Sequence, residues 1–277
     1  MLYDCHMHSK WSGDSEAEPA GMIASAKEKG LAGITFTDHL DWDFAAIPHM
    51  FDLDIEGYLS SMQALASAFA DDSFWIRTGL ELGLQTHLAE RHAKLLDGHS
   101  FDYVIGSIHQ IDGEDPYYDG FWENKTYFDA YQSYFLTTLD NIEAFHSFDA
   151  LGHLDYISRY GQRVAKQRTG DKTAGELHYR DFADLIDTLL LFLIRNDLAL
   201  EVNTAPYRYG FDEPNPSRDI LKRYHELGGR LLTIGADAHK PQDVAIGFSG
   251  LPDLLRECGF HSYFLYDKRK PVEVALA

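Results

Sequence analysis

Residues 2–8 read LYDCHMH, and this stretch shows the pattern on which the fold prediction depends. It begins with apolar, strand-forming residues and ends with alternating polar ones. Because a β-strand projects alternate side chains to one face, Asp4, His6 and His8 should point the same way. The residues between them should face surrounding helices. The stretch therefore predicts a strand whose carboxyl end carries two imidazoles and a carboxylate side by side.

The same pattern recurs along the chain. Seven further strand-like runs are GITFTDH (33–39), WIRTGLELG (75–83), YVIGSIH (103–109), ALGHLD (150–155), LALEVNT (198–204), LLTIGADAH (231–239) and SYFLY (262–266). Helical patterns lie between them at 20–29, 55–70, 125–145, 179–195 and 217–227. Gly30 and Gly228 stand where two of these helices should end.

Strands that alternate with helices predict an α/β protein with a parallel sheet and right-handed crossovers. Seven or eight such units in one domain, residues 1–277, favour a closed TIM-like barrel, which usually needs about 250 residues. An open doubly wound sheet is the alternative.

The composition limits the location and the partners. The formal charge is −20, from 44 acidic and 24 basic residues, which repels polyanions and argues against nucleic acid. A small phosphate ester is excluded less strongly, because bound divalent cations reverse the potential locally.

The N-terminus lacks a signal-peptide pattern, and the longest apolar run, 189–194, is too short to cross a membrane. Two cysteines in no metal or redox spacing indicate reduced, buried thiols. We therefore expect a cytoplasmic protein with no membrane contact, whereas the oligomeric state is not indicated.

Histidines gather at the carboxyl ends of the strand-like runs. Six of the 14 lie there: His6, His8, His39, His109, His153 and His239. Barrel enzymes assemble their sites at this end, and packing alone has no preference for it. Glu81 ends an apolar run, where an unpaired charge would be costly, although a salt bridge to an arginine would also explain it. The pattern predicts a metal cluster.

Motifs from one end of the chain to the other resemble one family in its order. They are DCHMHS (4–9), TDHLDW (37–42), GLELGLQ (79–85), GSIHQIDG (106–113), GHLDYISRYG (152–161), EVNTAPYRYG (201–210) and IGADAHKP (234–241). The chain resembles the PHP (polymerase and histidinol phosphatase) family, and within it the stand-alone histidinol-phosphate phosphatases.

The resemblance implies a distorted (β/α)₇ barrel with three divalent metal ions, either zinc, manganese or iron. By position, the first ion would be held by His6, His8, Glu81 and Asp237, the second by Glu81 as a bridge with His109 and His153, and the third by Asp14, His39 and His239. Many relatives have histidine where this chain has Asp14, so the third ion is expected to be a harder one. Without the resemblance, Asp14 would be interpreted as a turn or capping acid.

The resemblance also implies hydrolysis of a phosphate monoester, L-histidinol phosphate, by a metal-activated hydroxide. Arg159 and Arg208 would contact the phosphate, although ion pairs with surplus acids would also explain them. Asp155 would orient His153 or relay a proton to the leaving group. Glu201 and Asn203, on one strand face, are expected to meet the substrate amine, and residues 112–121 to form a rim or lid loop. The alternatives are a PHP phosphoesterase for a nucleotide or another small ester, and a non-enzymatic metal-binding domain.

Overall fold

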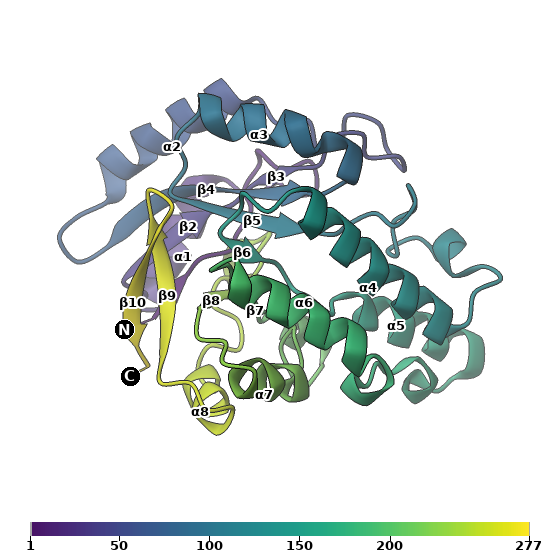
Figure 1. The fold of residues 1–277 in the computed structure, drawn as a ribbon. Coiled ribbons are helices and arrows are strands. Elements are labelled where there is room, and N and C mark those ends of the chain that lie inside the picture. Colours follow the sequence, from purple (N-terminus) through teal and green to yellow (C-terminus); the bar gives the residue numbers. More distant parts are fainter. Residues whose placement is uncertain (1, 277) are drawn as a thin grey trace.

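The computed structural model describes residues 2–276 and shows a curled parallel sheet inside a layer of helices (Figure 1). The strands of this sheet are β1 (Tyr3–Asp4), β2 (Gly33–Phe36), β3 (His39–Leu40), β4 (Trp75–Gly83), β5 (Tyr103–Ser107), β6 (Ala150–Leu151), β7 (Ala199–Asn203) and β8 (Leu232–Gly235). Their order is β1-β2-β4-β5-β6-β7-β8, with β3 paired to β4, and every pair is parallel.

The sheet nearly closes between its first and last strands. The backbone N–H of Cys5 donates to the carbonyl of Ile234 over 3.0 Å, and that of His8 donates to Ala238 over 2.8 Å. The hydrogen-bonded path contains seven strands, with helices around the outside, as in a distorted TIM-like barrel. The predicted barrel is therefore confirmed, and the open doubly wound sheet is not what the chain forms.

Eight α-helices are present in the described part of the chain. They are α1 (Pro19–Glu28), α2 (Ile55–Phe69), α3 (Ala89–Gly98), α4 (Tyr127–Ala144), α5 (Ile157–Thr169), α6 (Ala183–Arg195), α7 (Arg218–Glu226) and α8 (Leu251–Glu257). The five predicted helices correspond to α1, α2, α4, α6 and α7, with ends shifted by a few residues. Local signals fix their ends: Thr126 and Asp129 form a capping box at the start of α4, and Gly30 follows α1 with φ of 74°.

The last predicted strand forms, but outside the barrel. β9 (Ser262–Asp267) pairs with β10 (Lys270–Ala275) as an antiparallel hairpin. Lys268 and Arg269 form its two-residue turn with φ of 50° and 63°, the left-handed backbone that tight hairpins require. The side chain of Arg269 bonds to Asp149 and so ties the hairpin to the loop before β6. This segment therefore braces the barrel.

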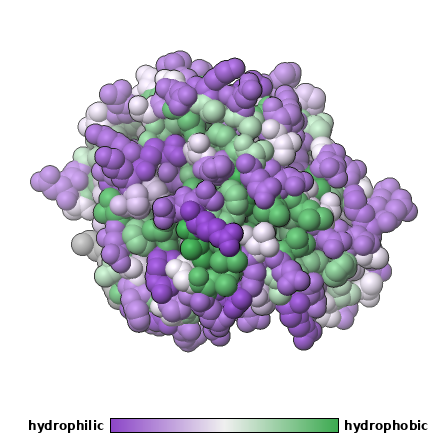
Figure 2. Space-filling model, in the orientation of Figure 1, coloured by the Kyte–Doolittle hydropathy of each residue, from purple (hydrophilic) through white to green (hydrophobic). Residues whose placement is uncertain are grey.

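The core is apolar and the surface is mostly polar. All four residues of β2 are buried, as expected for a strand covered on both faces. Hydrophilic residues make up much of the face shown in Figure 2, with apolar residues mainly near its middle. Among residues 2–276, no helix has both the length and the apolar character needed to span a bilayer.

Candidate metal centre

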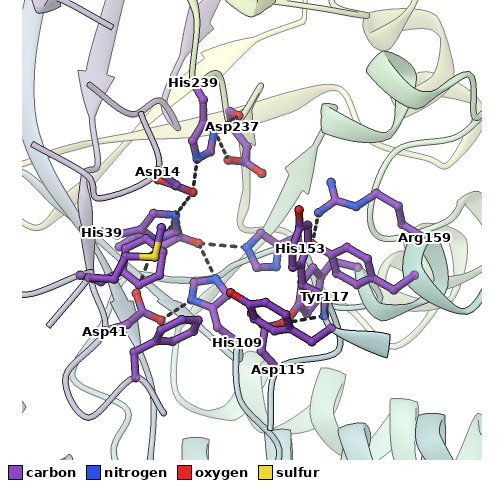
Figure 3. A pocket seen from close by; sticks show the side chains of 17 residues that line it. Asp14, His39, Asp41, His109, Asp115, Tyr117, His153, Arg159, Asp237 and His239 are labelled. Atoms are coloured by element: carbon purple, nitrogen blue, oxygen red, sulfur yellow. Dashed lines mark hydrogen bonds and ion pairs between the residues drawn. The ribbon is translucent and has the colours of Figure 1, made fainter. Parts of the chain in front are cut away.

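The strand ends meet at a pocket of about 400 Å³ that opens at the carboxyl-terminal side of the barrel (Figure 3). His6, His109, His153 and Asp237 each lie two residues beyond the end of a strand. The strands themselves are therefore short, and the site residues occupy their irregular extensions. All nine residues predicted as metal ligands come together here: His6, His8, Asp14, His39, Glu81, His109, His153, Asp237 and His239.

The first group of ligand atoms surrounds one oxygen of Glu81. Its Oε2 lies 3.1 Å from Nε2 of His6 and 3.4 Å from Nε2 of His8. Oδ1 of Asp237 lies 3.3 Å from the same His8 nitrogen and 3.9 Å from that of His6. Three of these four side chains are essentially inaccessible to solvent, with Asp237 slightly exposed. Four donor atoms thus face one small volume.

The second group surrounds the other oxygen of Glu81. Its Oε1 lies 2.9 Å from Nε2 of His153 and 3.4 Å from Nε2 of His109, and it accepts a hydrogen bond from the Ser107 hydroxyl over 2.7 Å. His153 has φ of 23°, an uncommon conformation for a residue with a side chain, and its backbone N–H donates to Glu201. Glu81 therefore lies between two sets of imidazoles and can bridge two ions.

The third group lies at the pocket mouth. Oδ2 of Asp14 is 3.1 Å from Nε2 of His239 and 3.7 Å from Nε2 of His39. The rings of His39 and His239 each stack on the His8 ring, at 4.2 and 4.1 Å between centroids, and lie 5.8 Å from each other. Asp14 reaches the cluster, so it is not a remote turn acid, although its side chain remains one-third exposed.

A second layer of acids holds the imidazoles. Oε1 of Glu201 lies 2.5 Å from Nδ1 of His6, and Oδ1 of Asp41 lies 2.5 Å from Nδ1 of His109. Such carboxylates fix the ring orientation and the tautomer, which leaves Nε2 free for a metal. Sequence reasoning missed Asp41. It stands two residues after His39, so the alternation that linked His6 to His8 could have found it.

Glu201 and Asn203 do not line the pocket, contrary to the expectation that they meet the substrate amine. Both residues are only 1% exposed to solvent, and the side-chain amide of Asn203 donates to the Glu201 carboxylate. Gly235 makes this arrangement possible, because a methyl group there would overlap Cβ of His6 and lie 2.8 Å from Oε1 of Glu201. Glu201 therefore supports the metal centre from behind.

These residues fit divalent metal ions. Ligand atoms about 2.0–2.2 Å from one ion lie about 3.0–3.5 Å from each other. The nitrogen–oxygen separations around Glu81 span 2.9–3.4 Å. Nδ1 of His39 is 3.1 Å from Oε2 of Glu81 yet forms no hydrogen bond with it, as expected of two atoms that face a common cation. Imidazole and carboxylate together are suited to zinc, iron or manganese.

Without a metal ion, Glu81 and the histidines around it strongly shift each other's pKa values. Burial alone would raise the pKa of Glu81, but the neighbouring His6, His39 and His109 hold it well below its usual value. Burial would lower the pKa of His6, whereas Glu201 and Glu81 raise it well above 6.5. In these buried groups, histidine protons therefore stand in for the positive charge that a metal ion would supply.

The two predicted arginines occupy different positions. Arg159, on α5, lines the pocket; its guanidinium lies 4.7 Å from the ring centroids of both Tyr160 and Tyr209 and donates to the Tyr160 hydroxyl. Figure 3 shows it pointing toward His153. Arg208 does not line the pocket. It donates to the backbone carbonyl of Asp237 over 2.9 Å and lies 3.9 Å from that carboxylate.

Asp155 lies in a neighbouring cavity and not in the metal pocket. Its carboxylate accepts hydrogen bonds from the Asn215 side chain over 2.5 Å and from the backbone N–H of Ser217 over 3.0 Å. Burial raises its pKa to about 6. These contacts favour a role in positioning the loop before α7 over direct proton transfer to a leaving group.

Comparisons with known proteins agree with this site. A PHP domain model matches residues 4–205. The chain is 30% identical to the probable histidinol-phosphatase of Clostridium acetobutylicum, over 97% of this chain and 98% of the relative. It is also 30% identical to the histidinol-phosphatase of Lactococcus lactis, over 96% and 95%. The crystal structure of histidinol phosphate phosphatase from Lactococcus lactis, complexed with zinc, L-histidinol and phosphate, matches with a TM-score of 0.86 at 29% identity and 98% coverage of both chains.

The chain therefore belongs to the PHP domain family, and it shares its fold with the histidinol phosphate phosphatase of Lactococcus lactis. Within that family, the relatives that match it over nearly their whole length are named histidinol-phosphatases. The resemblance of its motifs is confirmed, and several groups of His and Glu residues at the strand ends could hold a divalent metal ion.

Proposed function

We propose that the protein is a metal-dependent phosphatase that hydrolyses L-histidinol phosphate to L-histidinol and phosphate. The observation that carries the proposal is the Glu81 carboxylate, which lies between two sets of imidazoles with Arg159 beside them in the same pocket. The relative from Lactococcus lactis, bound to zinc, L-histidinol and phosphate, supports the choice of ester. The step belongs to histidine biosynthesis.

Three divalent ions are proposed, held by the three groups of residues described above. When bound, such ions neutralise the phosphoryl oxygens and lower the pKa of coordinated water, so that hydroxide is available near neutral pH. Glu81 would bridge two of them, since its two oxygens face different histidines. Zinc, manganese and iron are all compatible with this ligand set.

The protein's own residues would position the ester and hold the ligands. Arg159 would bind a non-bridging phosphate oxygen, since its guanidinium faces the pocket and no carboxylate lies within ion-pair distance of it in the described chain. Arg208 would fix Asp237 through its backbone carbonyl and reach the phosphate only if its side chain moved. The two cysteines are buried and lie outside the pocket, and we expect no phosphoenzyme.

A phosphate-release screen tests the proposal directly. Purified protein loaded with zinc or manganese is offered L-histidinol phosphate and a panel of nucleotide and sugar phosphates, while bound metal is quantified. We expect L-histidinol phosphate to be turned over at least about 100-fold faster than the other esters. Equal, slow turnover of every ester would reject the substrate and keep the phosphatase. Fewer than two bound ions per chain would reject the metal mechanism.

A further inference from the structure

One acid of the pocket has no histidine partner. Five carboxylates line the pocket, and four of them contact imidazoles of the metal centre. The fifth is Asp115, in the loop between β5 and α4. Within residues 2–276, the one hydrogen bond to its carboxylate comes from the backbone N–H of Tyr117, over 2.8 Å to Oδ1. Its second oxygen and its charge are thus available to a ligand.

A buried hydroxyl beside this acid also lacks a partner. Tyr156 is 6% exposed and lines the same pocket, and its hydroxyl forms no hydrogen bond with any residue between 2 and 276. Its ring packs against that of His153 at 4.8 Å and against that of His109 at 6.1 Å between centroids. Because buried polar atoms are nearly always hydrogen-bonded, a free one that lines a pocket points to a missing ligand.

The acid and the hydroxyl share one wall of the pocket. Burial, and then the nearby Asp115 carboxylate, raise the pKa of the Tyr156 hydroxyl well above its usual value. Tyr160 closes the wall, at 5.4 Å from Tyr156 between ring centroids. In Figure 3, Asp115 lies beneath Tyr117 and next to His109. The wall therefore offers two oxygen acceptors and several aromatic faces directly beside the metal ligands.

We propose that Asp115 and Tyr156 form a subsite for the primary ammonium group of the substrate, an inference that depends on the function proposed above. An ammonium carries three donors and a positive charge, which match a carboxylate, a hydroxyl oxygen and tyrosine faces. In L-histidinol phosphate, two carbon atoms separate the amine from the ester oxygen. A phosphate held at the metal centre therefore keeps the amine close to the pocket wall that carries this pair.

The test compares two esters that differ only in the amine. Initial rates are measured for L-histidinol phosphate and for its deamino analogue, with wild type, Asp115→Asn and Tyr156→Phe. We expect Asp115→Asn to lower kcat/KM for the amine ester by about 10- to 100-fold, and Tyr156→Phe by about 3- to 10-fold. Turnover of the deamino ester should stay within about threefold in both variants, which also shows that they fold and load metal.

Asp112→Asn is the matched control, since it makes the same chemical change in the same loop. Asp112 is exposed, lies outside the pocket, and has φ of 52°, which asparagine tolerates. Its turnover of both esters should equal that of wild type. An equal loss for both esters in Asp115→Asn, or no loss for either, would overturn the subsite. A wild type that does not prefer the amine ester would instead overturn the proposed substrate and the subsite with it.

Discussion

Glu81 shows how much one residue contributes to this site. Its two carboxylate oxygens lie within 3.4 Å of nitrogens from five histidines, and it is 1% exposed. A buried charge in such a place is tolerated only when positive charge surrounds it. Either protonated imidazoles or metal ions supply that positive charge. The buried Glu81 carboxylate therefore needs cations beside it, and it stabilises the cations that bind there.

We predict that Glu81→Gln removes activity and metal together. The amide keeps the shape of the side chain but lacks the charge, and its NH₂ group repels cations. We expect kcat to fall at least about 1,000-fold, and bound metal to fall below one ion per chain by elemental analysis. Ser107→Ala is the control, because it removes only the hydrogen bond to Oε1; its activity should stay within about tenfold of wild type. A Glu81→Gln protein with full metal content would contradict the bridging role.

At the level of single residues, the sequence predicted those site residues that follow from the alternation of side chains along a strand. His6 and His8 follow from that rule, and the strand-end position of His109 and His153 suggests their convergence. Asp115 and Tyr156 carry no such signal, since one lies in a long loop and the other just before a helix. Their importance depends on the absence of hydrogen-bond partners, which becomes visible only when the surrounding atoms are known.

At the level of elements, the strand ends bring the ligands together because neighbouring backbones approach closely. β8 ends at Gly235, next to the extension of β1 that carries His6. A side chain at this position would push His6 away from Glu201. The glycine is needed for space and not for a special φ.

Gly235→Ala should therefore weaken the first metal site from a position that touches no metal. We expect metal affinity to fall about 10- to 100-fold, as when a second-layer partner is lost, and stability to fall by about 1–3 kcal/mol from overpacking. Metal titration and chemical unfolding of the same protein measure both. Gly98→Ala, at the end of α3 with open space around its α-carbon, should change neither. Unchanged metal affinity in Gly235→Ala would show that Glu201 does not need to hold His6.

The elements themselves were partly predictable. Alternating strands and helices specify a parallel barrel, because right-handed crossovers leave few other arrangements. The sequence could not show that β1 and β6 contain two residues each, since the polar site residues continue the alternating pattern beyond the last ladder hydrogen bond. Nor could it show that β9 leaves the barrel, because a short apolar run looks alike in a barrel strand and in a hairpin.

At the level of the whole molecule, a chain with a charge of −20 concentrates buried carboxylates at one end of its barrel. Without metal, histidine protons balance this charge. Burial would lower the pKa of His39, but Glu81 and Asp14 raise it to about 9. Asp41 and Glu81 likewise raise the pKa of His109 well above 6.5 against the effect of burial. The metal-free protein should therefore keep protons on several of its ligands at neutral pH.

Metal loading should release these protons. A ring nitrogen binds a metal ion only when it is deprotonated, so His6, His39 and His109 must each lose a proton, about three in all at pH 7.5. Apparent metal affinity should consequently rise with pH, and the part of this rise that comes from His39 should be complete once the pH exceeds about 9, the pKa of His39. The release can be counted by titrating zinc or manganese into unbuffered protein at constant pH.

Coordinated water can also lose a proton, so a control is needed to isolate the contribution of histidine. The His39→Asn variant serves this purpose, because it should release at least one proton fewer than wild type. If the wild type bound metal without releasing protons, the ion pairs that connect these histidines to Glu81 would not exist in the metal-free protein.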